Sequence, residues 1–182
     1  MIGNDIIDLK LAAVQSNWQR KGWLHKIFTG SEQKTIWDAN DPNHMIWKLW
    51  SMKEAAYKAH QRCFSLSPKY NPWDFICTDN KVVTQNKSYQ TISKYTEDYI
   101  YTIAYSDAEN TNFVSKVFTG AQDQYKRILQ NYIADIKGVN LCDVTLQKDN
   151  RGIPDVKICN QSSHIPLSLS SHGSFSAFAI DL

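Results

Sequence analysis

The longest stretch of helical periodicity lies between Asn43 and Pro68, and it contains no Gly or Pro. At about 100° per residue its apolar side chains form one stripe that can pack on a sheet, namely Met45, Leu49, Met52, Ala56, Ala59 and Cys63. The opposite side sets an acid and a base among large aromatic residues, namely Glu54, Lys58, Trp47, Trp50 and Tyr57. We therefore expect one long central helix with Asn43 as its N-cap.

The polar side of this helix has two interpretations. Glu54 and Lys58 are four residues apart, so they can form an ordinary surface ion pair that contributes only about 0.3–0.5 kcal/mol. Surrounded by aromatic residues, the same pair can instead belong to a functional site. Asp5 raises a similar question, because a carboxylate in a short apolar strand must be paired, bind a metal or face solvent at an edge.

Shorter patterns predict the other elements of the first half. A strand is expected over Ile2–Leu9, a helix over residues 10–27 and a helical segment from Ser31 to about Trp37. After the central helix the pattern predicts four strands, Asp74–Thr78, Lys81–Thr84, Tyr89–Ser93 and Tyr99–Tyr105. We expect them to form an antiparallel sheet that packs on the central helix.

A polar break over residues 106–111 precedes a second half with the same kinds of element. An amphipathic pattern predicts a helix over residues 119–137, which Gly138 ends. Strands are expected at Cys142–Lys148, Asp155–Cys159, Pro166–Ser170 and Phe175–Ile180. The predicted fold class is therefore α+β, with two lobes over residues 1–107 and 118–182, each with an antiparallel sheet packed on a long helix.

The composition is that of a globular protein: the 182 residues are 42% hydrophobic and 21% charged, and the net charge is +2. This charge balance does not indicate binding to nucleic acid. No apolar run approaches the ~20 residues that span a bilayer. Charge within the first five residues excludes a secretory signal there. The four cysteines lack metal-site spacing, so we expect buried free thiols in a reducing compartment, the cytoplasm.

Five segments resemble, in sequence order, the motifs of one enzyme family. Trp50–Ala59 is similar to the Phe/Trp-x-x-Lys-Glu-Ala-x-x-Lys motif of the 4′-phosphopantetheinyl transferases. The other matches are Gly3–Leu9 with the Gly-x-Asp strand, Ile27–Glu32 with Phe-Thr-x-x-Glu, Gly152–Pro154 with Gly-x-Pro, and Leu167–Gly173 with the Ser-x-Ser-His loop. Each motif alone is weak, but their shared order is specific to this family.

The resemblance also implies an arrangement of the two lobes. Larger family members have two similar α+β lobes with one site between them, whereas the small carrier-protein-synthase type builds its site between subunits. Here the Gly-x-Pro and Ser-x-Ser segments follow the central helix, so the halves stand in the other order. We expect a pseudo-dimer that completes its site within one chain, as a monomer or a homo-oligomer.

The activity that the resemblance implies is transfer of 4′-phosphopantetheine from coenzyme A to a serine of an acyl or peptidyl carrier protein, with Mg²⁺ and release of adenosine 3′,5′-bisphosphate. Asp5 and Glu54 match the metal ligands, and Glu54 and Lys58 match the catalytic residues. The second acid of larger members is Ile7 here. Asp8 has the wrong parity to share a strand face with Asp5, so we do not count it as a ligand.

The resemblance places coenzyme A on Lys58, on the Arg151–Pro154 turn and on the serine-rich loop. The predicted contacts are Lys58, Arg151, Gly152, Pro154, Ser170, Ser171 and His172. Two positions depart from the family pattern. Ile153 replaces a phosphate-facing lysine, for which Arg151 is a candidate substitute. Ser171 stands at the family's histidine position, so either Ser171 contacts a phosphate or His172 reaches back into the site.

These departures keep other functions open. One alternative is a catalytically weakened protein of the same fold that binds coenzyme A or a carrier protein; another is a metal-dependent pyrophosphate hydrolase. A carrier protein, typically acidic around its serine, is expected to meet a basic or apolar patch. The segment Trp18–Lys26, with Arg20, Lys21 and Trp23, is a candidate, and a solvated helix face is the alternative.

Overall fold

The computed structural model describes residues 1–106, 112–120 and 122–181. The α+β class with antiparallel sheets is confirmed. The predicted polar break at residues 106–111 lies, apart from Ser106, outside the described residues.

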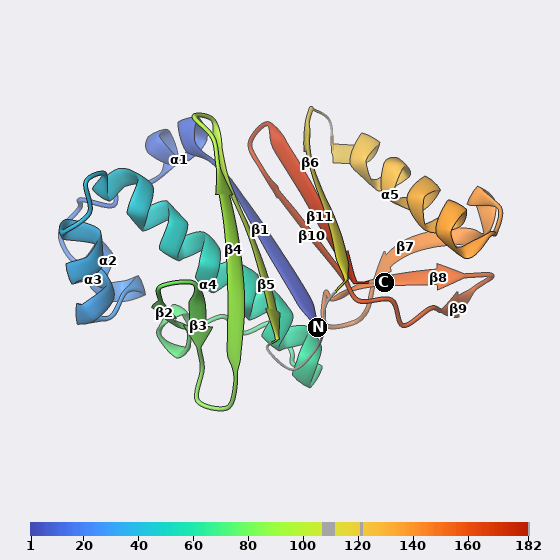
Figure 1. Ribbon diagram of the computed structural model, residues 1–182, viewed down its shortest axis with the longest axis horizontal. Helices are drawn as coiled ribbons and strands as arrows, with labels where there is room; N and C mark the ends of the chain where they lie inside the picture. Colours follow the sequence, from blue (N-terminus) through green and yellow to red (C-terminus); the bar gives the residue numbers. More distant parts are fainter. Residues whose placement is uncertain (107–111, 121, 182) are drawn as a thin grey trace.

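The first sheet has five antiparallel strands in the order β1-β5-β4-β3-β2. Their bounds are β1 Ile2–Asp8, β2 Ile76–Thr78, β3 Lys81–Val83, β4 Ser88–Tyr95 and β5 Tyr99–Ser106. The central helix α4, Pro42–Phe64, crosses one face of this sheet (Figure 1). The short helices α1 Leu9–Gln15, α2 Trp23–Ile27 and α3 Gly30–Trp37 lie around its N-terminal half. A 3₁₀ turn, η1 Pro72–Asp74, leads into β2.

The second half has a three-stranded antiparallel sheet in the order β10-β11-β6. Its strands are β6 Phe113–Thr119, β10 Leu167–His172 and β11 Phe175–Asp181, and α5, Gln122–Lys137, packs on it. A small sheet of β7 Val144–Lys148, β8 Pro154–Ile158 and β9 Gln161–Ser162 lies beside it, after the 3₁₀ turn η2 Leu141–Asp143. Strand β6 was not predicted, although its β-branched and aromatic residues favour a strand.

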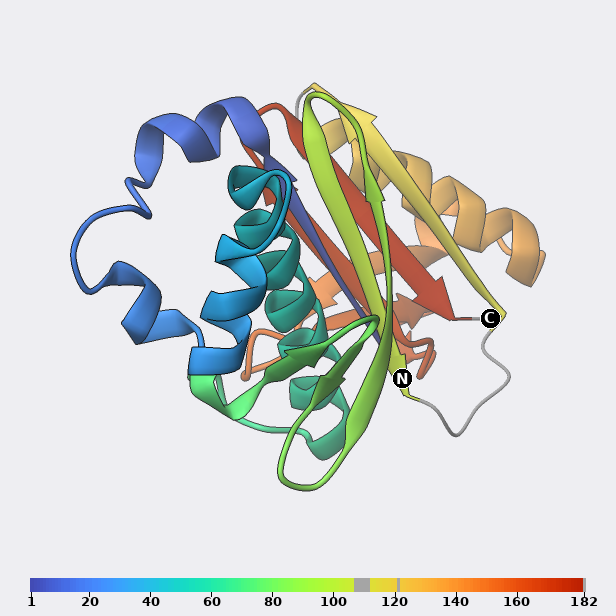
Figure 2. The ribbon, with the colours of Figure 1, turned by 60° about the vertical axis from the view of Figure 1, so that its left-hand side comes forward.

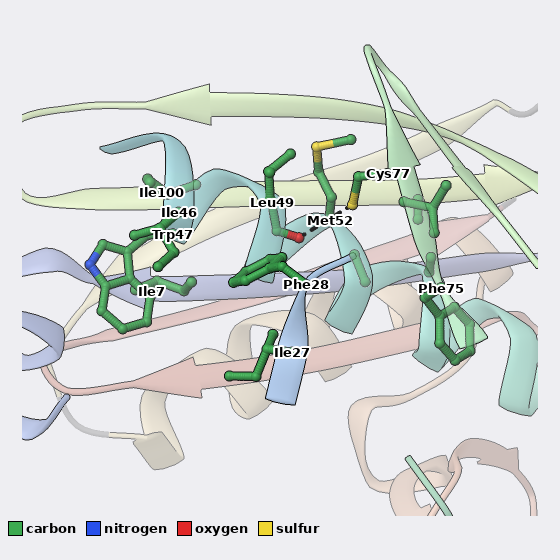
Figure 3. Packing of buried hydrophobic residues seen from close by; sticks show 14 of the residues in the cluster. Ile7, Ile27, Phe28, Ile46, Trp47, Leu49, Met52, Phe75, Cys77 and Ile100 are labelled. Atoms are coloured by element: carbon green, nitrogen blue, oxygen red, sulfur yellow. Dashed lines mark hydrogen bonds between the residues drawn. The ribbon is translucent and has the colours of Figure 1, made fainter. Parts of the chain in front are cut away.

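The two larger sheets meet along β1 and β10 (Figure 2). Apolar residues fill the space between them. Ile2 and Ile6 of β1 pack there with Ala177 and Ala179 of β11. A second cluster lies between the first sheet and its helices (Figure 3), and a third lies beneath α5. The order of layers is thus α4, first sheet, second sheet, α5. Each sheet carries one long helix, and the likeness of the two halves stays a prediction.

Three local predictions were wrong. The helix expected over residues 10–27 is split into α1 and α2, because Gly22 adopts φ +81° and Trp18 turns inward to donate its Nε1–H to Asn43 Oδ1 at 2.9 Å. Helix α4 begins at Pro42, which is suited to the first helical position, and Asp41 rather than Asn43 caps it. The cysteines are free, but only Cys77 is buried, since Cys63 is half-buried and Cys142 and Cys159 are exposed.

Candidate functional site

Helix α4 lies directly against strand β1 at Gly3. A Cβ atom built on Gly3 would stand 2.1 Å from the carbonyl oxygen of Ala55 and 2.5 Å from the backbone nitrogen of Ala59. No side chain fits there, so the glycine permits a contact between the two backbones. Asp5 is two residues further along and therefore lies on the same face of the strand, toward α4.

This contact brings Asp5 to the polar side of α4. Lys58 Nζ lies 3.2 Å from Asp5 Oδ1 and 2.9 Å from the carbonyl oxygen of Asn4. Glu54 lies one helical turn before Lys58, on the same side of α4. The structure therefore brings together the three residues that the sequence predicts at the reaction centre, from a strand and a helix about 50 residues apart.

Glu54 has a strongly raised pKa. Its pKa is raised from the ordinary value of 4.5 to about 7: burial is the largest cause, the negative charge of Asp5 adds to it, and the positive charge of Lys58 opposes both. Glu54 can therefore accept or release a proton near neutral pH, which is the property a general base needs.

Asp5 and Glu54 open onto a cleft of about 400 Å³ that we call the aromatic cleft. Its other walls come from α1, α2, α4 and the serine-rich strand β10, and they include Trp23, Trp47, Trp50, Ser171 and His172. The tryptophans also contact one another: the ring centroids of Trp23 lie 6.1 Å from Trp47 and 6.3 Å from Trp50. The cleft thus joins a pair of acids to an apolar wall.

Side chains of the serine-rich strand β10 bind the backbone of β1. Asn4 donates its backbone N–H to Ser168 Oγ at 2.9 Å, and Asp8 donates its own to His172 Nδ1 at the same distance. The Asn4 amide also donates to Ser170 Oγ at 3.0 Å. Because both backbone bonds join residues 164 positions apart, β10 runs parallel to β1. These bonds fix Ser171 and His172 relative to Asp5.

The three residues of β10 that were predicted to bind coenzyme A have different environments. Ser170 is buried and is bonded to Asn4, and it does not line the aromatic cleft, whereas Ser171 and His172 do. His172 is held from two sides, since its Nδ1 accepts from Asp8 and its Nε2 lies 3.3 Å from Gln15 Oε1. Both candidates for the family's histidine position therefore reach the cleft.

Asp8 has a structural role. Its Oδ1 accepts the backbone N–H of Leu11 at 3.0 Å, which caps α1, and its Oδ2 accepts that of Ser174 at 3.0 Å. A Cβ on Gly173, which adopts φ +56°, would stand 2.3 Å from Asp8 Oδ2. Backbone hydrogen bonds and the nearby His172 lower the pKa of Asp8 against the opposing effect of burial.

A second cleft, of about 350 Å³, lies on the other side of Lys58, and we call it the cationic cleft. It contains the remaining residues predicted to bind coenzyme A, and its charged lining residues are Lys58, Arg62, Lys148 and Arg151. Gly152, Pro154 and Ser168 also line it. Among the described residues that form its walls there is no Asp or Glu, so the cleft favours an anion.

Two residues of α4 attach the walls of the cationic cleft to the helix. Gln61 donates its side-chain amide to the carbonyl oxygen of Arg151 at 3.0 Å. Arg62 donates to the carbonyl oxygens of Pro154 and Leu167, and burial lowers the pKa of its guanidinium. These bonds hold the Gly-x-Pro turn at a fixed position along the axis of α4, about one helical turn after Lys58.

The guanidinium group of Arg151 is already hydrogen-bonded within the protein. Its Nε and Nη2 donate to Asp149 Oδ2 at 2.9 and 2.7 Å, and its Nη1 donates to the carbonyl oxygen of Ser65 at 3.1 Å. Asp149 Oδ1 also accepts the backbone N–H groups of Arg151 and Ile153. Arg151, the predicted substitute for the family's lysine, thus lines the cationic cleft with part of its donor capacity already used.

A buried ion pair beside the site was not predicted. Lys53 Nζ lies 2.8 Å from Glu32 Oε1, and neither side chain is more than 1% exposed. Glu32 also caps α3 through Thr29 and accepts the backbone N–H of Cys77 at 2.7 Å. Both residues belong to recognised motifs, and Lys53 directly precedes Glu54. No local signal could have found the pair, because Lys53 and Glu32 are 21 residues apart in the sequence.

None of the described helices is both long and apolar enough to cross a bilayer. No cluster of three or more His, Cys, Asp or Glu residues that could hold a metal occurs within the described ranges.

Residues 1–105 match the model of the ACPS family, the 4′-phosphopantetheinyl transferase superfamily. The chain belongs to this superfamily. The match contains Asp5, Glu54 and Lys58, whereas the serine-rich loop and the Gly-x-Pro turn lie beyond it. No curated protein matches the chain significantly.

Two solved structures are similar to this transferase-superfamily chain. Thermotoga maritima holo-[acyl-carrier-protein] synthase has 10% identity and a TM-score of 0.44, over 89% of this chain and 84% of that one. Helicobacter pylori holo-[acyl-carrier-protein] synthase in complex with coenzyme A has 13% identity and a TM-score of 0.29, over 99% and 97%.

Proposed function

We propose that this protein transfers 4′-phosphopantetheine from coenzyme A to a serine of an acyl or peptidyl carrier protein. One observation carries the proposal: Asp5, Glu54 and Lys58 meet at the boundary between the aromatic and the cationic cleft. Membership of the superfamily supports the same chemistry.

Coenzyme A has two anionic regions, its pyrophosphate and its ribose phosphate, and a neutral pantetheine arm. The cationic cleft suits the adenosine 3′,5′-bisphosphate end, and the aromatic cleft suits the pantetheine arm. The pyrophosphate then lies between them, at Lys58. An ammonium group there offsets negative charge on the phosphates as the bond to the leaving group breaks.

The acids fit a hard divalent cation. Mg²⁺ usually takes one or two protein carboxylates and completes its shell with phosphate oxygens and water. Asp5 and Glu54 supply two carboxylates whose mutual repulsion a cation would relieve, and Lys58 contacts only Oδ1 of Asp5. When bound, Mg²⁺ would neutralise pyrophosphate charge and make its phosphorus more electrophilic.

The carboxylate of Glu54 can accept the proton that the acceptor serine loses. The acceptor serine loses its hydroxyl proton as its oxygen bonds to the pantetheine-linked phosphorus, and the bond from that phosphorus to the bridging oxygen breaks. Glu54 takes the proton directly or through a water; because metal ligation makes a carboxylate less basic, the water path is favoured. Adenosine 3′,5′-bisphosphate leaves with the bridging oxygen.

A binding protein of the same fold is the second candidate. Two observations favour it: Ile153 replaces the phosphate-facing lysine, and Arg151, its substitute, is held by Asp149. Such a protein would bind coenzyme A or a carrier protein without transferring the group.

Intact-mass spectrometry of carrier proteins separates these functions. Several apo carriers are incubated with coenzyme A, Mg²⁺ and either the wild type or the Glu54→Gln variant. A transferase adds one phosphopantetheine to a carrier and releases equimolar adenosine 3′,5′-bisphosphate, and the variant does neither at a comparable rate. Bisphosphate release without a carrier indicates a hydrolase, and binding without transfer indicates a binding protein.

A further inference from the structure

The cationic cleft contains one lysine that the family motifs do not predict. Lys148 is the last residue of β7, its side chain is exposed, and it lines the cleft together with Lys58 and Arg151. It makes no side-chain hydrogen bond or ion pair with any residue that the structure describes. A lysine without a partner in a cleft that has no described acidic wall residue is available to a ligand anion.

The other cations of this cleft are already engaged. Lys58 contacts Asp5, Arg62 holds the carbonyl oxygens of Pro154 and Leu167, and Arg151 is held by Asp149. Each can bind an anion only with the donors that remain. Phosphate binding therefore costs the least at Lys148, because no existing hydrogen bond or ion pair of its side chain must break.

Strand pairing places Lys148 beside the Gly-x-Pro turn. Lys148 lies directly opposite Pro154 in the antiparallel pair of β7 and β8, next to Ile153. Arg62 contacts the carbonyl oxygen of this same Pro154. Lys148 therefore lies at the Arg62 end of the cleft, which is about 6 Å along the helix from Lys58 and about 12 Å from Glu54 at 1.5 Å per residue.

This separation distinguishes the phosphates of coenzyme A. In the proposed function the pyrophosphate lies at Lys58, so the phosphate further from the reacting phosphorus, on the ribose 3′ position, extends toward the Arg62 end. We propose that Lys148 binds the 3′-phosphate and makes the site prefer coenzyme A to 3′-dephospho-coenzyme A. The lysine absent at position 153 is then replaced from the neighbouring strand. This inference rests on the proposed function.

The test is a binding measurement with both ligands. Isothermal titration calorimetry gives the affinities of the wild type, Lys148→Met and Lys157→Met for coenzyme A and for 3′-dephospho-coenzyme A. Lys157 is the matched control, because it lies in the same small sheet, on β8, but outside the cleft. The wild type should prefer coenzyme A, and Lys148→Met should lose roughly tenfold for coenzyme A alone. Lys157→Met should resemble the wild type.

The outcomes separate this inference from the proposed function. If the wild type binds neither ligand, the proposed function fails and the inference fails with it. If the wild type binds coenzyme A and Lys148→Met loses nothing, or loses equally for both ligands, only the assignment of Lys148 is overturned. A Lys148→Arg variant that keeps the preference supports a charge contact with the 3′-phosphate.

Discussion

Lys58 Nζ on α4 lies 3.2 Å from Asp5 Oδ1 on β1, and this contact is where the aromatic and cationic clefts meet. Asp5 lines one cleft and Lys58 the other. Gly3 permits the contact, because it lets α4 rest on the backbone of β1. A substrate that extends from one cleft into the other must pass this pair. In the proposed function the pyrophosphate of coenzyme A would therefore lie beside Asp5 and Lys58.

Asp5 and Lys58 should shift the pKa of Glu54 in opposite directions. In Asp5→Asn the repulsion disappears and the pKa falls below about 7, although burial, the larger cause, keeps it above 4.5. In Lys58→Met the attraction disappears and the pKa rises. NMR titration of ¹³C-labelled glutamate in metal-free protein measures both. Shifts of the same sign in the two variants would contradict the electrostatic coupling.

The stability of the metal-free protein should depend on Glu54 and on pH. Because the folded-state pKa is raised, the folded protein holds the proton more tightly than the unfolded chain, so stability is lost as pH rises from about 4.5 through 7. Glu54→Gln lacks this loss. The unfolding free energy of the variant minus that of the wild type should therefore be up to roughly 3 kcal/mol larger at pH 8 than at pH 4. Urea unfolding at several pH values measures this. Added Mg²⁺ at pH 8 should stabilise the wild type more than the variant, and an equal response would argue against Glu54 as a ligand.

Removing one partner of the buried pair Lys53–Glu32 should destabilise the fold strongly. Lys53→Met leaves the carboxylate of Glu32 buried without its counter-charge, which costs about 3–5 kcal/mol. The double variant Lys53→Met/Glu32→Gln should recover part of this loss. The exposed pair of Lys34 and Asp38 is the control, and Lys34→Met should have little effect. A similar small effect at both pairs, measured by chemical unfolding, would contradict a stabilising role for the buried one.

Gly3→Ala should separate β1 from α4. The added Cβ would stand 2.1 Å from the carbonyl oxygen of Ala55, so we expect a loss of about 1–3 kcal/mol or more in unfolding free energy and a fall in transfer rate. Gly30→Ala is the matched control, since no atom lies within 4 Å of its added Cβ. Should Gly3→Ala retain both stability and transfer, the close contact would not position Asp5.

The sequence predicts the elements that follow one continuous pattern. Helix α4 has an uninterrupted helical periodicity, β1 is a short strand with apolar bulk from its isoleucines, and the motif residues Asp5, Glu54 and Lys58 lie together as expected. The helix over residues 10–27 was wrong because the chain becomes extended at Ser16 and adopts a positive φ at Gly22, and periodicity encodes neither backbone conformation.

The parts that sequence could not predict depend on distant contacts. Lys53 and Glu32 are 21 residues apart, and no local pattern pairs them. The cationic cleft needs β8 and β10 to dock on α4 through Gln61 and Arg62, whose partners are carbonyl oxygens about 90 to 105 residues away. A backbone carbonyl has no residue-specific signal, so this docking is visible only in three dimensions.

A crystal structure with coenzyme A and Mn²⁺ in place of Mg²⁺ tests the central claim most directly. Anomalous scattering should locate one Mn²⁺ between Asp5 and Glu54, with pyrophosphate oxygens completing its shell and the adenosine bisphosphate end in the cationic cleft. A metal peak elsewhere, or coenzyme A bound away from Lys58, would contradict the account.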